Sequence, residues 1–133
     1  MRGDEEQMKV YINNLEWEIA EVEKDNEKLK ADDNTFCYGT CRYYENTIYL
    51  DRNLCEAHKK KVLAHELTHA YIFSHLLKYS ENYTEEEVCE FISCYGKQIW
   101  NQVDEYFFKQ DLPKNQDPTH FNQTILKKRV HTQ

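Results

Sequence analysis

Residues 63–71 read LAHELTHAY and place His65 and His69 four positions apart, with Glu66 directly after the first histidine. In an α-helix, side chains four positions apart lie on the same face, so two imidazoles at this spacing can bind one Zn²⁺ ion. A glutamate at the position of Glu66 can act as general base toward a water molecule at such a metal. An HExxH string also arises by chance, but this one lies in a stretch of clear helical periodicity. We therefore expect a zinc site on a helix.

Two long helices are predicted around and after this motif. Apolar residues recur at helical spacing over residues 55–78, which predicts the first helix. Thr84 is a favourable N-cap for the second, and Glu87, three residues later, completes the pattern of a capping box. The second helix is expected to end near Phe108. Its expected buried stripe consists of Val88, Ile92, Tyr95, Ile99 and Val103.

The N-terminal third of the chain predicts strands. Residues 9–23 alternate apolar and acidic side chains after the turn-forming pair Asn13 and Asn14, which favours a β-hairpin over the competing amphipathic helix at residues 15–29. Residues 24–34 predict a short helix or loop. Residues 35–50 predict two more strands joined by a turn at Glu45 and Asn46, and residues 51–53 offer caps for the first helix. Together these elements predict an α+β fold.

Size and charge narrow the class of protein. A chain of 133 residues makes one domain, expected over residues 1–112 with its core at about 9–108 and a polar tail at 113–133. The apolar runs are too short to span a membrane. A net charge of −7 disfavours a nucleic-acid-binding protein. No secretory leader is visible, and the five cysteines form no CxxC pair, so reduced thiols and a cytoplasmic location are expected.

A catalytic zinc site needs a third protein ligand, and the second helix offers carboxylates for it. Glu86 and Glu90 are four residues apart and share a helical face, so one can reach the metal while the other orients an imidazole. Glu85 and Glu87 are expected to compensate the helix dipole. Cys89 is expected to pack as a small buried side chain. Three tyrosines are candidate oxyanion stabilisers, namely Tyr71, Tyr83 and Tyr95.

The stretch HELTHA followed by EEVCEFIS resembles the gluzincin metallopeptidases, in particular the small ImmA/IrrE-like proteins of bacteria and phages. The resemblance covers about residues 9–108. It implies a minimal zincin fold, with a small N-terminal β-sheet packed on the HExxH helix and a second, glutamate-bearing helix. It also implies Zn²⁺ bound by His65, His69 and Glu86, with Glu66 as catalytic base and Glu90 in support.

Two positions depart from the family pattern. Cys89 replaces an alanine, and Glu90 replaces an asparagine or aspartate. The longer side chain of Glu90 leaves open that this residue binds the metal and that Glu86 is accessory.

The activity implied by the resemblance is zinc-dependent hydrolysis of peptide bonds in a protein or peptide substrate, such as a phage or bacterial regulator. The alternative is a catalytically silent, zinc-stabilised interaction module that binds its partner through the acidic residues 1–34, whose net charge is −6. Glu66 favours the enzyme, because a purely structural zinc site has no use for a base. No nucleic-acid or membrane partner is expected.

Overall fold

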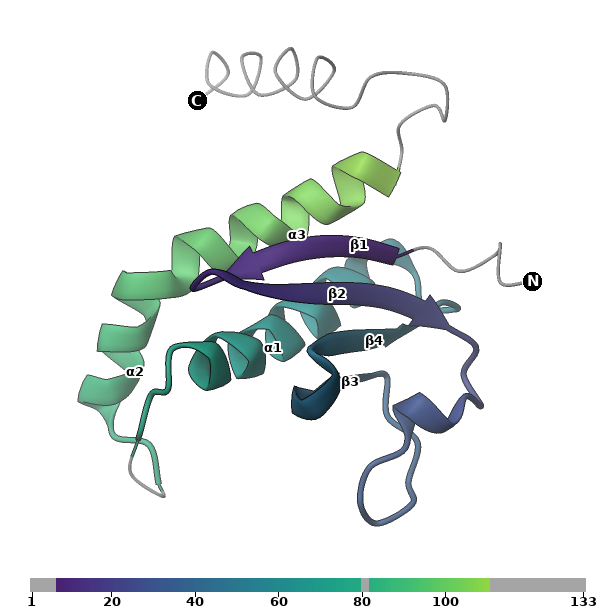
Figure 1. The fold of residues 1–133 in the computed structure, drawn as a ribbon, viewed down its shortest axis with the longest axis horizontal. Helices are drawn as coiled ribbons and strands as arrows, with labels where there is room; N and C mark the ends of the chain where they lie inside the picture. The colour runs from purple at the N-terminus through teal and green to yellow at the C-terminus, as the bar shows by residue number, and fades with distance from the viewer. Residues whose placement is uncertain (1–6, 80–81, 111–133) are drawn as a thin grey trace. The chain divides into compact units, whose positions relative to one another are not determined.

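The computed structural model describes residues 7–79 and 82–110, and Figure 1 shows their arrangement. The described chain is α+β, with one small mixed sheet and helices, as predicted. The chain divides into two compact units, residues 1–103 and 104–133, and the first of these contains the sheet and the HExxH helix. The predicted tail at residues 113–133 lies outside the described residues.

Four strands form the sheet in the order β1-β2-β4-β3. Their bounds are β1 Gln7–Ile12, β2 Leu15–Val22, β3 Gly39–Arg42 and β4 Thr47–Asp51. The outer pairs β1–β2 and β3–β4 are antiparallel, whereas the central pair β2–β4 is parallel. The sheet thus consists of two antiparallel pairs joined through one parallel ladder, and β1 and β3 are its edges.

The first hairpin confirms the strand interpretation of residues 9–23. Ile12 pairs with Leu15 across a two-residue turn in which Asn13 and Asn14 have φ angles of 50° and 67°. Asparagine tolerates this left-handed conformation better than most residues, and two-residue turns of this kind match the twist of the flanking strands. The second pair turns through the 3₁₀ segment Tyr43–Glu45, with Asn46 again left-handed at φ 50°.

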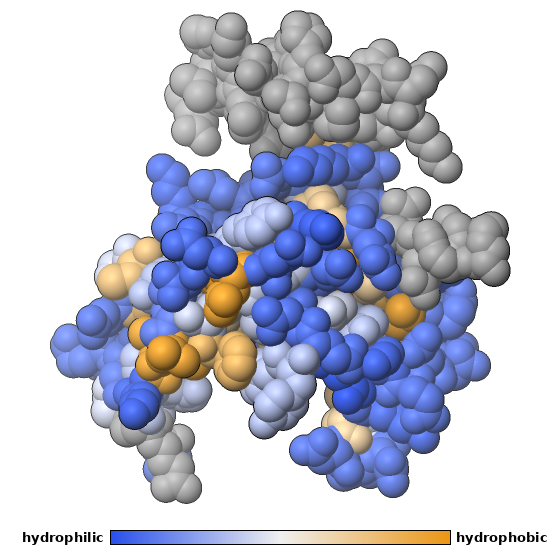
Figure 2. Space-filling model, in the orientation of Figure 1, coloured by the Kyte–Doolittle hydropathy of each residue, from blue (hydrophilic) through white to orange (hydrophobic). Residues whose placement is uncertain are grey.

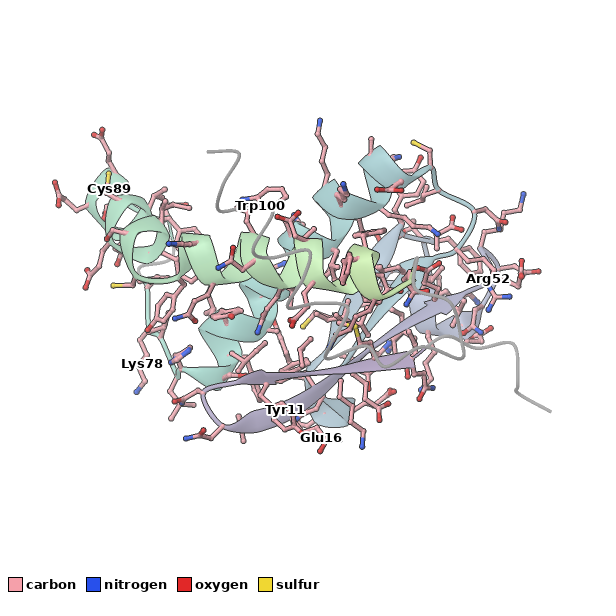
Figure 3. All side chains as sticks on the ribbon, turned by 90° about the horizontal axis from the view of Figure 1, so that it is seen from above. Tyr11, Glu16, Arg52, Lys78, Cys89 and Trp100 are labelled. Carbon is pink, nitrogen blue, oxygen red and sulfur yellow. The ribbon has the colours of Figure 1, made fainter. Side chains whose placement is uncertain are left out.

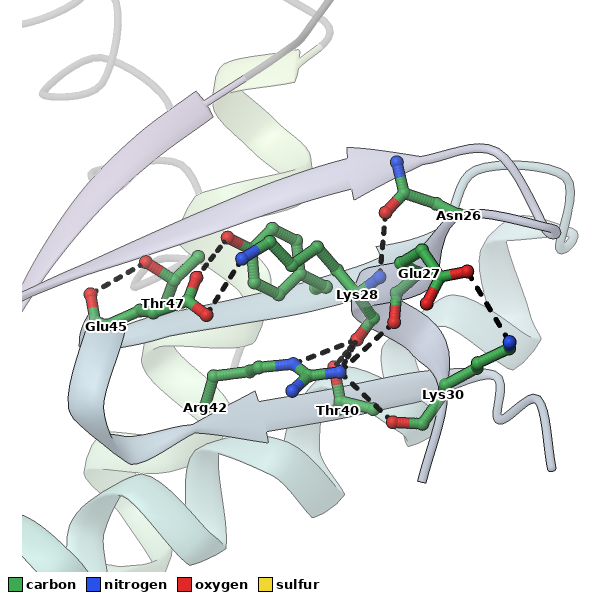
Figure 4. Close-up of polar contacts among 9 residues, drawn as sticks. Asn26, Glu27, Lys28, Lys30, Thr40, Arg42, Glu45 and Thr47 are labelled. Atoms are coloured by element: carbon green, nitrogen blue, oxygen red, sulfur yellow. Dashed lines mark hydrogen bonds and ion pairs between the residues drawn. The ribbon is translucent and has the colours of Figure 1, made fainter. Parts of the chain in front are cut away.

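A short 3₁₀ helix, η2 (Glu27–Leu29), interrupts the long connection between β2 and β3. Arg42, at the end of β3, donates to the backbone carbonyls of Glu27, Lys28 and Lys30 at 3.0–3.2 Å (Figure 4). The Thr40 hydroxyl donates to the Lys28 carbonyl at 2.7 Å. These bonds satisfy carbonyls that no strand pairs with, and they fix the connection against the edge strand β3.

The HExxH helix α1 spans Glu56–Ser74, so it begins one residue later and ends four residues earlier than predicted. Its N-cap is Cys55, which makes no side-chain capping bond, and Asp51 accepts instead from the backbone of Asn53. The predicted capping by residues 51–53 is therefore wrong.

At its C-terminus, α1 ends in a Schellman motif. The Leu76 N–H bonds to the Phe73 carbonyl, and the Leu77 N–H bonds to the Ile72 carbonyl. Leu76 has φ 55° in the position that glycine usually occupies, and its side chain is 79% exposed. Hydrophobic surface gathers over this end of α1 in Figure 2. This helix end was not predictable because it lacks the glycine that usually marks such a motif.

The second predicted helix is broken into three parts, α2 (Glu85–Phe91), a π-helical turn η4 (Ile92–Gly96) and α3 (Lys97–Gln110). The capping box of Thr84 and Glu87 is confirmed, with both reciprocal hydrogen bonds present. The predicted buried stripe is wrong in its first half, because Val88 and Ile92 are 51% and 59% exposed. The π-turn inserts an extra residue into the helical phase, so Phe91 takes the inward position before Ile99 and Val103 do.

Helix α1 packs against one face of the sheet (Figure 1). The helix and β3 approach closely at Gly39, where an added Cβ would lie 2.5 Å from Val62 Cγ1. Lys59 forms an ion pair with Glu21 of β2 at 2.7 Å, and both side chains are largely buried. The buried apolar residues of the first unit are Val10, Ile12, Trp17, Ile19, Ala20, Val22, Leu29, Ile48, Leu50, Leu63, Leu67, Ala70, Tyr71, Phe91, Ile99 and Val103. None of the described helices has the length and apolarity that a membrane span requires.

Candidate metal centre

His65 and His69 lie one turn apart on α1, with their ring centroids 5.0 Å apart and their planes inclined by 72°. Both side chains are open to solvent on the same face of the helix. The structure therefore brings the two predicted imidazole ligands together as the spacing requires.

The surrounding protein and His65 both influence the ionisation of His69. Partial desolvation of the imidazole by the surrounding protein, and next the nearby charge of His65, lower the pKa of His69 below its usual value. A lowered pKa favours the neutral imidazole at neutral pH, which is the form that binds a metal. The electrostatics of the pair thus suit metal binding.

Glu66 lies against the edge strand β3. It is buried, with 7% of its surface exposed, and its Cγ would lie 3.3 Å from a Cβ added to Gly39. Burial raises the pKa of Glu66 to about 7. The negative charge of Glu66 in turn contributes to the raised pKa of Cys41 on β3, after burial of the thiol itself. Glu66 therefore sits between the helix and the sheet edge, with a pKa suited to moving protons near neutrality.

A cavity of about 300 Å³ opens beside the two histidines, between α1 and α2. The α1 side contributes Thr68 and Ile72 in addition to the two imidazoles. The opposite wall is formed by Tyr79, Tyr83, Glu87, Val88, Phe91 and Ile92. The sequence pattern predicted that Val88 and Ile92 would be buried in the core, so this wall of the cavity was not predicted. The break in helical phase at η4 explains the position of these two side chains.

The carboxylates of α2 do not complete a metal site with the histidines. Glu86 and Glu90 are exposed and lie outside the cavity lining, whereas Glu87 lies within it. Across residues 7–79 and 82–110, no group of three His, Cys, Asp or Glu side chains is placed to hold a metal ion. Two imidazoles thus fit two positions of a zinc site, and the described side chains do not supply the third.

The remaining candidates from the sequence have different surroundings. Cys89, expected to be buried, is exposed at the outer end of α2 (Figure 3). The Tyr71 hydroxyl donates to the partly buried Gln102 side chain at 2.9 Å. Tyr95 packs against Phe91 with centroids 5.3 Å apart. Of the three candidate oxyanion stabilisers, Tyr83 alone lines the cavity.

Comparison with known proteins returned no relative. No protein-family model matches the chain, and neither the curated proteins nor the solved structures contain a significant match.

Proposed function

We propose that the protein is a zinc-dependent metallopeptidase of the gluzincin type, similar to the ImmA/IrrE-like proteins. The observation that carries the proposal is the arrangement on α1: two imidazoles 5.0 Å apart open to a cavity, and a buried glutamate faces the neighbouring sheet edge. This combination matches the division of labour in HExxH peptidases, in which the histidines hold the metal and the glutamate handles protons.

His65 and His69 would hold the zinc ion. The third ligand is expected from α2, where the resemblance assigns Glu86, with Glu90 as alternative, and where Glu87 is the carboxylate that lines the cavity. When bound, a zinc ion supplies Lewis-acid polarisation of the scissile carbonyl and of a water molecule.

Glu66 would perform the proton transfers. As a carboxylate it accepts a proton from the attacking water, and as a carboxylic acid it returns the proton to the leaving amine. A pKa of about 7 makes both forms accessible near neutral pH. Within the part of the chain that the structure describes, β3 beside Glu66 is an edge strand, to which an extended substrate could add as a further strand.

The substrate class follows from the resemblance, which indicates a protein such as a bacterial or phage regulator. The alternative function is a zinc-stabilised interaction module without turnover. One observation favours it, because no third ligand is assembled among the described residues.

The deciding experiment compares wild type, His65→Ala, His69→Ala and Glu66→Gln for zinc content and for hydrolysis of a library of fluorescence-quenched peptides. We expect about one zinc per wild-type chain and much less in both histidine variants. Glu66→Gln should retain zinc and fold yet lose hydrolysis by about 100-fold or more, since glutamine cannot accept the proton.

Each outcome separates the two functions. Equal zinc content in wild type and both histidine variants would contradict the proposed metal site. Equal rates of hydrolysis by wild type and Glu66→Gln would contradict the peptidase mechanism. Zinc binding through the histidines without hydrolysis by wild type would favour the interaction module.

A further inference from the structure

The wall of the cavity opposite His65 and His69 contains three aromatic side chains, Tyr79, Tyr83 and Phe91. The rings of Tyr79 and Tyr83 meet edge to face with centroids 5.5 Å apart, and Tyr79 meets Phe91 in the same way at 6.3 Å. Edge-to-face ring clusters present both faces and edges to a further ring, which is the geometry that aromatic guests prefer.

Apolar side chains at the cavity remain open to solvent. Val88 is 51% exposed, Ile92 59% and Tyr83 60%, although all three line the same hollow. Apolar surface that is exposed to water in a concave site raises the free energy of the protein. Binding of an apolar group removes this surface from water and lowers the free energy again. The cavity volume of about 300 Å³ is at the lower end for ligand pockets, so it suits one bulky side chain rather than a helix.

The charge at the cavity selects against acidic guests. Among the described lining residues Glu87 is the one carboxylate, and Glu85 and Glu86 precede it on the same helical turn. A guest carboxylate would be placed beside the like charge of Glu87, which is unfavourable.

We propose that this cavity is a specificity pocket that accepts a bulky apolar side chain, preferably aromatic, from an extended peptide bound at the histidine pair. The proposal rests on the proposed peptidase function for the origin of the peptide. The recognition itself depends only on the lining residues. The affinity of the pocket decreases from aromatic to small apolar to acidic side chains.

The test uses small ligands that isolate the side chain. N-acetyl-phenylalaninamide, N-acetyl-alaninamide and N-acetyl-aspartamide are titrated into the full-length protein, with and without added zinc, and binding is followed by NMR chemical shifts. We expect the phenylalanine ligand to bind in the millimolar range, as is usual for so small a molecule. It should bind at least about tenfold more tightly than the alanine ligand, with the largest shifts at Ile72, Val88 and Phe91.

A matched pair of variants locates the site. Val88→Trp fills the cavity from its mouth and should abolish the preference for the phenylalanine ligand. Cys89→Trp adds the same side chain one residue on, at an exposed position outside the lining, and should leave the preference unchanged. Because Val88 and Cys89 are both exposed, neither variant disturbs the core, and thermal unfolding checks this.

The proposal is overturned if the phenylalanine and alanine ligands bind alike or not at all. It is also overturned if the shifts fall outside the cavity, or if Cys89→Trp acts as strongly as Val88→Trp. Failure of the peptidase proposal is distinguishable, because it would appear as missing hydrolysis in the peptide library while the preference for phenylalanine persists in this titration.

Discussion

The indole N–H of Trp17 donates a hydrogen bond to the Ser74 hydroxyl at 2.8 Å, and both side chains are buried. Trp17 lies on β2 and Ser74 is the last residue of α1, so this bond fastens the end of the HExxH helix to the sheet. The Asn13 side chain adds a second link by donating to the Ser74 carbonyl at 3.0 Å. The position of the histidines along the sheet therefore depends on this junction.

Replacing Ser74 with alanine should destabilise the protein by about 1–3 kcal/mol, because the buried indole N–H loses its partner. Urea denaturation measures the effect. In a double-mutant cycle with Trp17→Phe, which has no N–H to leave unpaired, the Ser74→Ala step should cost markedly less. An equal cost in both backgrounds would show that the hydrogen bond contributes nothing.

Leu76→Gly should stabilise the protein by about 1 kcal/mol, since glycine adopts the left-handed conformation of this position without the steric cost that leucine meets. The matched control is Leu77→Gly, which removes a partly buried side chain at the next residue and should destabilise. Thermal unfolding of the two variants checks the opposite signs. Destabilisation by both changes would contradict the strain at Leu76.

Gly39→Ala should destabilise by about 1–3 kcal/mol, because its Cβ would meet Val62 Cγ1 at 2.5 Å and force α1 away from β3. Val62→Ala removes that methyl group, so the double variant should be more stable than the sum of the single changes predicts. Purely additive losses in urea denaturation would mean that the two residues do not meet.

Glu87→Gln should weaken zinc retention under chelator challenge more than Glu86→Gln or Glu90→Gln, because Glu87 alone of the three lines the cavity with the histidines. Glutamine is also suited to a capping box, so the N-cap of α2 is preserved and the charge is what changes. A supporting residue typically costs 10- to 100-fold in affinity, and a ligand is expected to cost more. The largest loss in Glu86→Gln would instead support the ligand that the family resemblance assigns.

Cys41 should react with iodoacetamide at pH 8 about 100-fold more slowly than the exposed Cys55. Burial, with a contribution from the charge of Glu66, raises the pKa of the Cys41 thiol to about 12, so little thiolate is present. Raising the pH from 7 to 9 should leave Cys41 largely protonated and slow. Peptide mapping by mass spectrometry follows each cysteine, and unfolding in urea should remove the difference.

Local sequence signals predicted much of this fold. The paired Asn13 and Asn14 marked a hairpin because few residues tolerate two consecutive left-handed conformations. Thr84 and Glu87 marked the start of α2 because a capping box is built from residues three positions apart. The histidine pair was predictable for the same reason, since one helical turn sets its geometry.

Features that depend on packing between elements were not predictable in this way. The π-turn at Ile92–Gly96 has no residue signature, so the inward face of the second helix was assigned to Val88 instead of Phe91. The end of α1 lacked a glycine, so four further residues were expected to be helical. The carboxylate facing the histidines depends on how α2 rotates against α1, and that rotation is fixed only when the two helices pack.

The parallel ladder between β2 and β4 has a consequence for the folding pathway. Each antiparallel pair closes over a short turn and forms from neighbouring residues, whereas Glu18 of β2 meets Thr47 of β4 only after the intervening chain has been organised. The connection loses conformational entropy before the contacts between β2 and β4 compensate for it, and this slows folding. During synthesis the β1–β2 hairpin leaves the ribosome before β4 exists, with one hydrogen-bonding edge unpaired. The docking of the two hairpins is thus expected to limit the folding rate. Helix α1 can pack against the complete sheet only after that step.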